Sequence, residues 1–279
     1  LQCDTHNEID ELLECNGLVD LLIPRGSNKF VKYIMDNTNI PVMGHADGIC
    51  HIYVDKGIIN QDVDITNRVD YDDAIRIIID AKTQYTAACN AVETLLIERD
   101  PLIIENFIPR LITALKENGI KLRGTGEMAD VIDKYYQDRP DDAALGKLDY
   151  ERIDESDFIE YLSLTVSAKF VDGVDEAIEH INLHSSHHTD SIITNDIEEA
   201  ERFMNLVDSA GVYWNCSTRF ADGFRYGFGA EVGISTSKIH ARGPVGLEGL
   251  VTYKYKLVGS GQIVGDYASG KSKFHFIDL

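Results

Sequence analysis

The stretch YDDAIRIIIDAKTQYTAACNAVETLLI, residues 71–97, joins a helix pattern directly to a strand pattern. Ile75 and Ile78 recur at helical spacing within residues 71–86, and the apolar run 92–97 has the length of a buried strand. A helix that leads at once into a buried strand is typical of α/β proteins with a parallel sheet. This stretch therefore predicts the fold class.

The same alternation extends on both sides of this stretch. Predicted helices cover residues 6–16, 28–36, 101–118, 174–182 and 196–209. Predicted strands cover residues 18–23, 49–54, 161–170, 191–194 and 212–215, and another begins at residues 41–43. We expect the acidic residues 60–73 to form a surface insertion and the polar residues 137–156 to form a loop.

The C-terminal segment differs in character from the rest of the chain. Large side chains alternate along residues 250–258, and Gly259-Ser260-Gly261 follows, a pattern that predicts a β-hairpin. An isolated hairpin is marginally stable in water, and its open edge needs a partner. We expect this segment to contact a second copy of the chain in a homo-oligomer. The alternative is a hairpin that folds back on its own domain.

The composition is that of a globular protein with an acidic surface. Against 26 Lys and Arg stand 47 Asp and Glu, a net charge of −21 that disfavours binding to nucleic acid or to an anionic membrane surface. No apolar run approaches the roughly 20 residues of a membrane span. The five cysteines show no CxxC pairing, which favours a reducing compartment, the cytoplasm, over a disulfide framework. They are Cys3, Cys15, Cys50, Cys89 and Cys216.

Three motifs imitate ligand sites without completing them. The acidic run 62–73 lacks the glycine and the terminal Glu of a calcium loop. Glycines at 259–265 follow a strand pattern and open no helix, so a dinucleotide-binding loop is not expected there. The third motif has metal-ligand residue types but no partner cluster with tetrahedral spacing. It consists of His184, His187, His188 and Asp190. The sequence therefore predicts no metal site.

Pro24-Arg25-Gly26-Ser27 lies between a predicted strand and a predicted helix. The unpaired N–H groups of a helix N-terminus suit a phosphate group, and Arg25 adds a charged donor. Gly26 permits a close approach of the backbone. An ordinary capped turn is the alternative.

Cys89 is flanked by small residues in the segment Ala87-Ala88-Cys89-Asn90-Ala91. Small neighbours leave room for a substrate carbon to reach the sulfur, and nearby N–H groups could stabilise an oxyanion. A nucleophilic cysteine is one interpretation, and a buried structural cysteine is the other.

The segment NCSTRFADGFR, residues 215–225, gathers amide, hydroxyl and guanidinium groups after a predicted strand. It cannot be regular helix or strand throughout, so it suits an anion pocket. A solvated loop is the alternative.

Four motifs together resemble γ-glutamyl phosphate reductase, the proline-pathway branch of the aldehyde dehydrogenase superfamily. They are IPRGSNK (23–29), GHADGICH (44–51), AACNAVETLL (87–96) and the run 215–246. They occur in the family's order and cover essentially the whole chain. The family includes the reductase half of fused Δ1-pyrroline-5-carboxylate synthetases.

The resemblance implies an α/β, aldehyde dehydrogenase-like fold. Residues 1–48 would end a Rossmann-type cofactor domain, residues 49–232 would form the catalytic domain, and residues 233–279 would return and form the oligomerisation hairpin. The chain begins at Leu1, without Met, about halfway through the family's cofactor domain. We therefore expect a piece of a longer protein that is inactive or nearly so alone.

The resemblance also implies a reaction. L-Glutamyl 5-phosphate would be reduced with NADPH to L-glutamate 5-semialdehyde, with release of phosphate, and Cys89 would be the nucleophile that forms a thioester. The residues expected near the cofactor are Arg25, Gly26 and Ser27 at its phosphates and Glu160 at the nicotinamide ribose. The residues expected to bind substrate are Asn90, Asn215, Ser217, Thr218 and Arg219.

One departure bears on the type of reaction. General aldehyde dehydrogenases carry a catalytic Glu near the position where this chain reads Gly44-His45-Ala46-Asp47-Gly48. That Glu activates the water that hydrolyses the thioester, so its absence favours a reductase over an oxidising dehydrogenase. A non-catalytic assembly module derived from such a reductase is a further alternative. The family also implies a glutamate 5-kinase as a partner or fused domain, and a mitochondrial location if the source is a fused eukaryotic enzyme.

Overall fold

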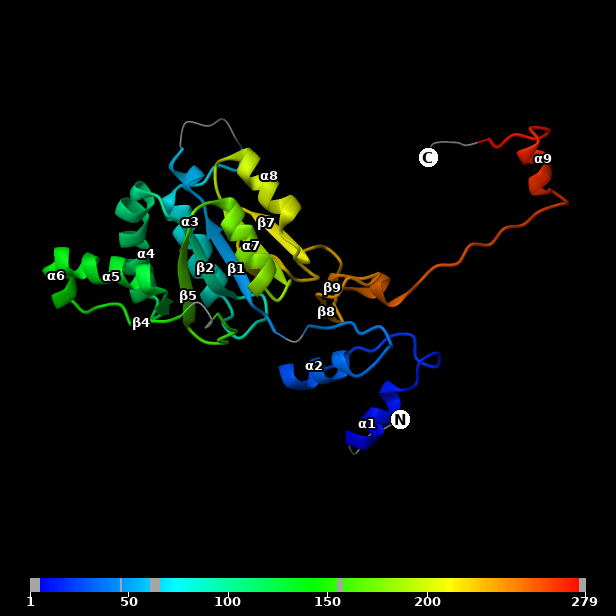
Figure 1. Cartoon of the computed structure of the whole chain (residues 1–279), viewed down its shortest axis with the longest axis horizontal. Coiled ribbons are helices and arrows are strands. Elements are labelled where there is room, and N and C mark those ends of the chain that lie inside the picture. The colour runs from blue at the N-terminus through cyan, green and yellow to red at the C-terminus, as the bar shows by residue number, and fades with distance from the viewer. Residues whose placement is uncertain (1–5, 46, 61–65, 155–157, 276–279) are drawn as a thin grey trace. The chain divides into compact units, whose positions relative to one another are not determined.

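The computed structural model describes residues 6–45, 47–60, 66–154 and 158–275. Within them, seven strands form one entirely parallel sheet in the order β4-β3-β5-β2-β1-β6-β7. The strands are β1 (Cys50–Val54), β2 (Val92–Glu98), β3 (Lys121–Gly124), β4 (Tyr150–Arg152), β5 (Thr165–Val171), β6 (Thr189–Ile193) and β7 (Gly211–Trp214) (Figure 1). The α/β fold class predicted from the sequence is confirmed.

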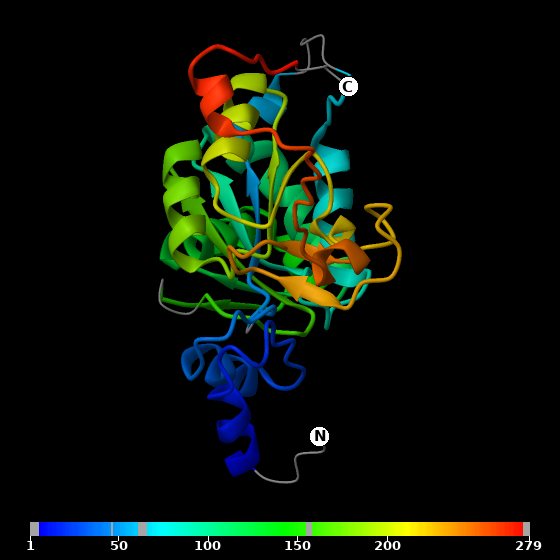
Figure 2. The same ribbon diagram turned by 90° about the vertical axis from the view of Figure 1, so that its right-hand side faces the viewer.

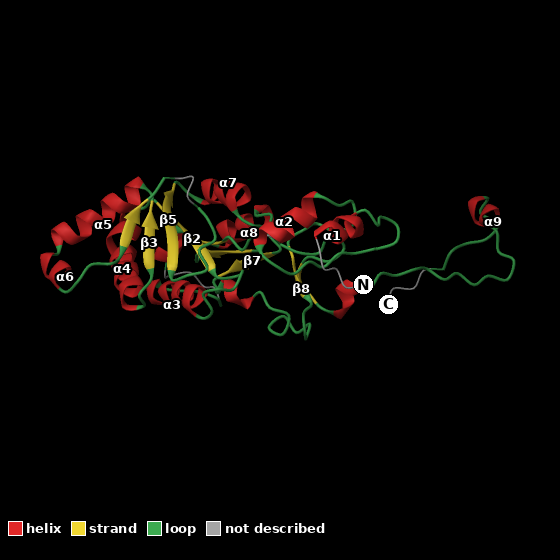
Figure 3. Ribbon diagram, turned by 90° about the horizontal axis from the view of Figure 1, so that it is seen from below, coloured by secondary structure: helices red, strands yellow, loops and turns green. Residues whose placement is uncertain are grey.

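Helices connect successive strands and cover both faces of the sheet. They are α1 (His6–Leu13), α2 (Asn28–Asp36), α3 (Tyr71–Thr83), α4 (Ile108–Glu117), α5 (Gly126–Asp138), α6 (Pro140–Ala144), α7 (Val174–His184), α8 (Ile197–Leu206) and α9 (Val264–Ala268). Figure 2 shows α7 on one side of the sheet and α3 on the other, and Figure 3 shows the same two layers along the strands. Short helical turns in the described part of the chain are η1 (Lys56–Ile59), the π-turn η2 (Ile103–Phe107), η4 (Thr218–Phe220) and η5 (Leu247–Leu250).

Alternation along the strands divides the core between the two faces. Ile52 and Val54 of β1 pack in the cluster under α3 and α4, whereas Tyr53 between them packs in the cluster under α7 and α8. All three side chains are fully buried. This is the period-two pattern of a strand buried on both faces, and it fixes the register of β1 in the middle of the sheet.

Local capping sets where several helices begin. Asp70 and Asp73 form a reciprocal capping box at the start of α3. Ser27 accepts a hydrogen bond from the Phe30 amide and caps α2, which begins at the predicted residue. Such caps satisfy donors that the first helical turn leaves unpaired.

Two strands predicted near the N-terminus are wrong. Residues 18–23 and 41–43 share one isolated bridge, between Leu22 and Val42, and Val19 forms another with Asn16; neither bridge extends into a strand. Leu18 is 86% exposed, so the apolar run is not a buried strand. Pro24 and Pro41 lack the N–H that a longer ladder would need at either end of this pairing.

The predicted loop at 137–156 is wrong in part, because α6 and β4 lie within it. Strand β3 and helix α5, which both precede α6 in the chain, are not predicted by the sequence pattern. Tyr136 of α5 and Leu148 are buried in the core, and the Tyr136 hydroxyl accepts a hydrogen bond from the Leu148 amide. This long-range contact orders a segment whose local composition is polar.

By its internal contacts the chain divides into Leu1–Gly249 and Leu250–Leu279. The first unit also contains an antiparallel pair, β8 (Gly233–Ser235) with β9 (Gly243–Val245). The predicted C-terminal hairpin is wrong for the described residues of the second unit. Residues 251–258 pair with no described strand, and the expected return strand is replaced by α9. Alternating side chains form a strand only beside a partner edge, and here Leu257 is 98% exposed.

The domain boundaries predicted at 48/49 and 232/233 stay predictions. Asp62 and Asp64 of the calcium-like run, and Cys3, lie outside the described residues. Cys15, Cys50, Cys89 and Cys216 are all free thiols. Among the described helices, each is too short or too polar to cross a membrane.

Candidate active site

Cys89 lies in the turn between α3 and β2, three residues before the strand begins. His188 directly precedes β6, and Gly48 lies two residues before β1. Because β1 pairs with both β2 and β6, the amino ends of these three strands meet at one edge of the sheet. The Cys89 sulfur lies 3.2 Å from Nε2 of His188. The topology therefore gives the candidate nucleophile an imidazole partner.

Both members of this pair are neutral near pH 7. Burial raises the pKa of the Cys89 thiol to about 11, and the Glu160 carboxylate also raises it. Burial lowers the pKa of His188 to about 3. Nδ1 of His188 lies 2.9 Å from the Thr189 hydroxyl. A proton on Nδ1 shared with that hydroxyl leaves Nε2 to accept a hydrogen bond from the thiol.

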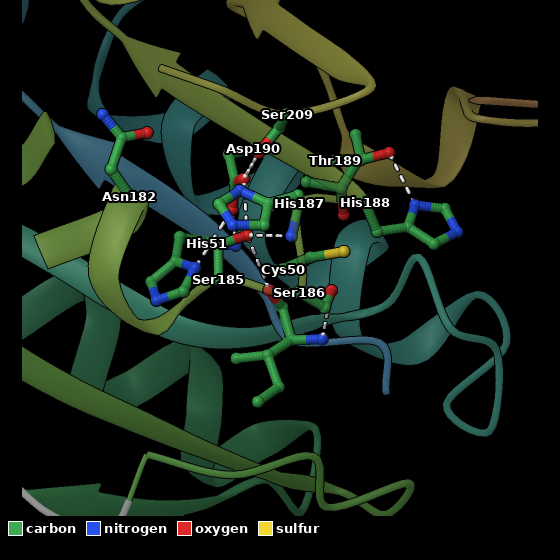
Figure 4. A network of polar contacts seen from close by, with 12 residues as sticks. Cys50, His51, Asn182, Ser185, Ser186, His187, His188, Thr189, Asp190 and Ser209 are labelled. Atoms are coloured by element: carbon green, nitrogen blue, oxygen red, sulfur yellow. Dashed lines mark hydrogen bonds and ion pairs between the residues drawn. The ribbon is translucent and has the colours of Figure 1, made fainter. Parts of the chain in front are cut away.

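A buried polar network fixes the neighbouring ends of β1 and β6 (Figure 4). The Asp190 carboxylate accepts the backbone N–H of His51 at 2.7 Å and lies 3.0 Å from Nδ1 of the same residue. The hydroxyls of Ser185 and Ser209 also donate to Asp190. Since His51 and Asp190 are fully buried, this network holds the strand that follows His188 in register with β1.

The backbone of Gly48 packs directly against the backbone of Cys89. A β-carbon added to Gly48 would lie 2.3 Å from the Cys89 carbonyl oxygen and 2.5 Å from its Cα. No side chain fits in this space, and backbone cannot move aside as a flexible side chain can. The position of the nucleophile therefore depends on a glycine at 48.

Glu160 connects this glycine to the start of α2. Its Oε1 accepts the Gly48 backbone N–H at 2.9 Å, and its Oε2 accepts the side-chain amide of Asn28 at 2.7 Å. Asn28 is the first residue of α2, directly after the cap Ser27. The structure thus joins Glu160, a predicted cofactor-binding residue, to the residue that follows Ser27 in a hydrogen-bonded chain that ends beside Cys89.

Arg25 and Gly26 lie in the loop before α2. The Arg25 guanidinium packs on β8, since a β-carbon on Gly233 would lie 2.7 Å from its Nη2. A β-carbon on Gly26 would lie 2.8 Å from the ring of Phe30. The Arg25 guanidinium therefore lies against β8, while residues 25–27 are exposed.

Asn215 lies at the opposite, carboxyl end of the sheet, directly after β7. Its Oδ1 accepts the Thr194 N–H at 2.9 Å, and its Nδ2 donates to the carbonyls of Thr194 and Asn67. The backbone has φ of +55°, a left-handed turn. The structure does not bring this predicted substrate residue to Cys89, and its amide holds the strand end in place.

After Asn215 the chain runs back to the edge of the sheet where the amino ends of β1, β2 and β6 meet and where Cys89 lies. The Thr218 hydroxyl donates to the Asn90 carbonyl at 2.7 Å, and the Asn90 side-chain amide donates to the Ala221 carbonyl at 2.8 Å. These reciprocal bonds fasten η4 to the residue after the nucleophile. Asn90 is buried, and its Oδ1 has no partner among the described residues.

Arg219 is the cation that this return places beside the nucleophile. It lies near enough to lower the pKa of Cys89, while its own pKa is lowered, chiefly by burial. Its Nε donates to Gln84 at 2.9 Å, and its guanidinium lies over the Tyr85 ring. Its backbone N–H donates to the Ser217 hydroxyl at 3.3 Å. The other two guanidinium nitrogens have no hydrogen-bond partner among the described residues and suit an anion.

A groove of about 970 Å³ runs beside this segment. Asn215 and Ser217 line it, together with residues of α3 and α4, whereas Cys89 does not. The groove therefore borders the predicted substrate residues Asn215 and Ser217 but does not reach the nucleophile.

His188 is the residue that the sequence reasoning missed as a partner of Cys89. It was considered with His184, His187 and Asp190 as a metal motif. A usable signal existed, because His188 lies three residues before the predicted strand 191–194, as Cys89 lies three residues before the predicted strand 92–97. The sequence did not reveal that these two strands flank the same central strand.

Comparisons with known proteins give this chain close relatives, although no protein-family model matches it. It is 53% identical over 271 residues to γ-glutamyl phosphate reductase of Acetivibrio thermocellus, covering 97% of the chain and 56% of the relative. It is 52% identical to γ-glutamyl phosphate reductase 1 of a Synechocystis species, covering 99% of the chain and 57% of the relative. The chain thus spans a little over half the length of the curated relatives it matches.

Solved structures agree with these relatives. γ-Glutamyl phosphate reductase of Thermotoga maritima superposes with a TM-score of 0.79 at 35% identity, over 94% of this chain and 57% of that one. An acetylating aldehyde dehydrogenase of Geobacillus thermoglucosidasius shares the fold, with a TM-score of 0.56 at 18% identity over 92% of this chain and 61% of that one. The chain is therefore a homologue of γ-glutamyl phosphate reductases with an aldehyde dehydrogenase-like fold, as the four motifs predict.

Proposed function

We propose that this chain carries the catalytic cysteine of a γ-glutamyl phosphate reductase, which converts L-glutamyl 5-phosphate to L-glutamate 5-semialdehyde and phosphate. The observation that supports this best is the 3.2 Å contact between the Cys89 sulfur and His188, with Arg219 beside the same sulfur. A nucleophile, a hydrogen-bond acceptor that orients its thiol and a cation are groups that suit acyl transfer from an acyl phosphate.

In the first step the Cys89 sulfur attacks the acyl carbon of the substrate. The thiol, held by its contact with Nε2 of His188, loses its proton to solvent as a carbon–sulfur bond forms, and the bond from the acyl carbon to the phosphate oxygen breaks. Phosphate leaves with the electron pair of that bond. Arg219 binds the leaving phosphate through its free guanidinium nitrogens. Holding the three groups together supplies the effective concentration that the reaction needs.

The nicotinamide cofactor, NADPH in this proposal, would supply the hydride that reduces the thioester to the aldehyde. The residues present fit such a group. The first turn of α2, capped by Ser27, offers backbone N–H groups to a phosphate. The Glu160 carboxylate uses one acceptor site on each oxygen and keeps another on each for a ribose hydroxyl. Arg25 and Gly26 shape the loop that leads into this turn.

The predicted substrate residues divide into two groups by what their side chains already bind. Asn90, Asn215 and Thr218 make hydrogen bonds within the protein and hold η4 beside Cys89. Ser217 and Arg219 keep donors for a substrate: the Ser217 hydroxyl accepts the Arg219 N–H but retains its own O–H, and Arg219 uses only Nε, toward Gln84. We propose positioning for the first group and anion binding for the second.

Oligomerisation and location belong to the same proposal. Residues 251–258 carry exposed large side chains and could add a strand to a sheet of a second copy, which would make a homo-oligomer. A glutamate 5-kinase would supply the acyl phosphate, as a partner or a fused domain. The cysteine usage favours the cytoplasm.

The alternatives make different predictions for one variant. The protein is expressed from its complete reading frame and assayed for phosphate-dependent oxidation of glutamate 5-semialdehyde. Cys89→Ser should lower activity at least a thousandfold with an unchanged circular dichroism spectrum, while Cys216→Ser keeps most of it. An unmodified protein without activity would support the assembly module, and activity that does not require phosphate would support an oxidising dehydrogenase.

A further inference from the structure

We infer that Cys89, His45 and His188 form a binding site for a zinc ion. One ligand atom from each residue lies within 4.8 Å of the other two. The sulfur and Nε2 of His188 are already 3.2 Å apart. No other trio of His, Cys, Asp or Glu in the described ranges meets this criterion.

The distances are close to those of a zinc site. Zinc lies about 2.3 Å from sulfur and about 2.0 Å from imidazole nitrogen, so tetrahedral ligand atoms are roughly 3.5 Å apart. The Cys89–His188 pair is at that spacing. The His45 ligand atom lies within 4.8 Å of the other two, so it would need to approach each by at most about 1.3 Å, which side-chain rotation can supply. The ring of His45 stands perpendicular to that of His188, with centroids 5.2 Å apart, so the two rings converge without stacking.

Both imidazoles have the outer partners that metal-binding histidines usually have. Nδ1 of His45 lies 3.1 Å from the Ile234 carbonyl oxygen, and Nδ1 of His188 lies 2.9 Å from the Thr189 hydroxyl. A ligating histidine typically donates its second N–H to a carbonyl or similar oxygen, which fixes the tautomer and the ring. In each ring this arrangement leaves Nε2 as the lone-pair donor. These two partners, Ile234 and Thr189, lie on β8 and β6, far from Cys89 in the sequence.

The donor set selects the metal by chemistry. One thiolate and two imidazoles suit zinc, whereas calcium and magnesium require oxygen ligands. Three protein ligands leave a fourth position for water, as in open zinc sites. An ion can enter because Cys89 and His45 are partly exposed, although His188 is buried.

Zinc binding would displace the thiol proton and occupy the sulfur lone pair that attacks a substrate. The ion would therefore act as a reversible inhibitor that competes with substrate and shields the thiol from oxidation. Binding at these three residues does not depend on the reaction proposed above, so it can be tested without an activity assay.

The test uses cobalt(II) as a spectroscopic probe for zinc on the purified, reduced protein. A cobalt–thiolate bond gives a charge-transfer band in the near ultraviolet, and one equivalent of zinc should remove it. We expect one band per chain, loss of the band in Cys89→Ser, and at least tenfold weaker cobalt binding in His45→Gln and His188→Gln.

Two matched controls complete the experiment. His184→Gln removes a histidine of the motif first considered as a metal site, and Cys216→Ser removes another partly exposed thiol; both should keep the band. Circular dichroism confirms that each variant is folded, and if His188→Gln unfolds, His45→Gln decides alone. The inference is overturned if the unmodified protein gives no band, if both histidine variants keep full affinity, or if a control variant loses the band.

Discussion

Gly48 and Cys89 meet backbone to backbone: a β-carbon on Gly48 would lie 2.3 Å from the Cys89 carbonyl oxygen. The Gly48 N–H donates to Glu160 at 2.9 Å, so the same glycine also holds the carboxylate that faces the thiol. One residue without a side chain thereby sets the distance between the candidate nucleophile and the candidate cofactor contact.

The first prediction concerns this glycine. Gly48→Ala should displace the Cys89 backbone and lower the rate of acyl transfer at least a hundredfold, because small misplacements of reacting groups are costly. Gly44→Ala is the matched control, since its β-carbon would meet Pro24 at an ordinary 3.4 Å. Thiol alkylation mapped by peptide mass spectrometry and semialdehyde oxidation are both measured. Equal rates in the two variants would refute the prediction.

A second prediction follows from the raised pKa of Cys89. With a pKa of about 11, the thiolate fraction should rise about tenfold per pH unit between pH 7 and 10. The rate of Cys89 alkylation by iodoacetamide should rise in parallel, without a plateau below pH 10. Glu160→Gln keeps an acceptor for Gly48 but removes the charge, so its profile should shift to lower pH. A plateau near pH 8 in the unmodified protein would show that the thiol is already ionised.

The third prediction concerns the buried pair Lys82–Glu93, whose charged atoms lie 2.5 Å apart at 1% and 0% exposure. Glu93 also accepts the Leu162 N–H, two residues after Glu160. Lys82→Met should lower the free energy of unfolding by about 3 to 5 kcal/mol, because it leaves a buried charge unpaired. Adding Glu93→Gln should recover part of that loss. Urea unfolding measures both, and a double variant no more stable than Lys82→Met would count against the pairing argument.

The fourth prediction is a pH dependence of stability. Burial raises the pKa of Asp55 to about 7, above the roughly 4 of an unfolded Asp, while neighbouring donors, including Asp55, lower that of Glu98. Asp55 therefore takes up a proton when the chain folds at pH values between 4 and 7. The resulting contribution to the free energy of unfolding is complete below pH 4 and is lost as the pH rises through 7. Between pH 4 and 8, the free energy of unfolding should fall less in Asp55→Asn than in the unmodified protein. The difference should be at least about 1 kcal/mol. Parallel pH profiles for the two proteins would contradict this assignment.

The sequence predicted what local patterns determine. Helical spacing located α2, α3 and α7, and the apolar runs located β1, β2 and β6, because both periodicities reflect burial on the two faces of one sheet. The Ser27 cap was also predictable, since an N-cap acts within a single turn. Cys89 was found from its small neighbours and its motif.

The remaining features depend on contacts between distant segments. The resemblance predicts Asn215 as a substrate residue, and the pairing of β6 with β7 places its amide against Thr194, which the sequence pattern does not reveal. His188 reaches Cys89 only because β1 lies between β2 and β6. The alternation in 250–258 signals a strand, yet a strand also needs a partner edge, which the sequence pattern does not specify.

The most direct test of the account is to locate the covalent intermediate. The protein from its complete reading frame is incubated with glutamate 5-semialdehyde and NADP in the absence of phosphate, quenched with acid and mapped by mass spectrometry. The account predicts a glutamyl thioester on Cys89 that disappears when phosphate is added before the quench. A glutamyl group on another residue, or substrate turnover with no acylated Cys89, would contradict it.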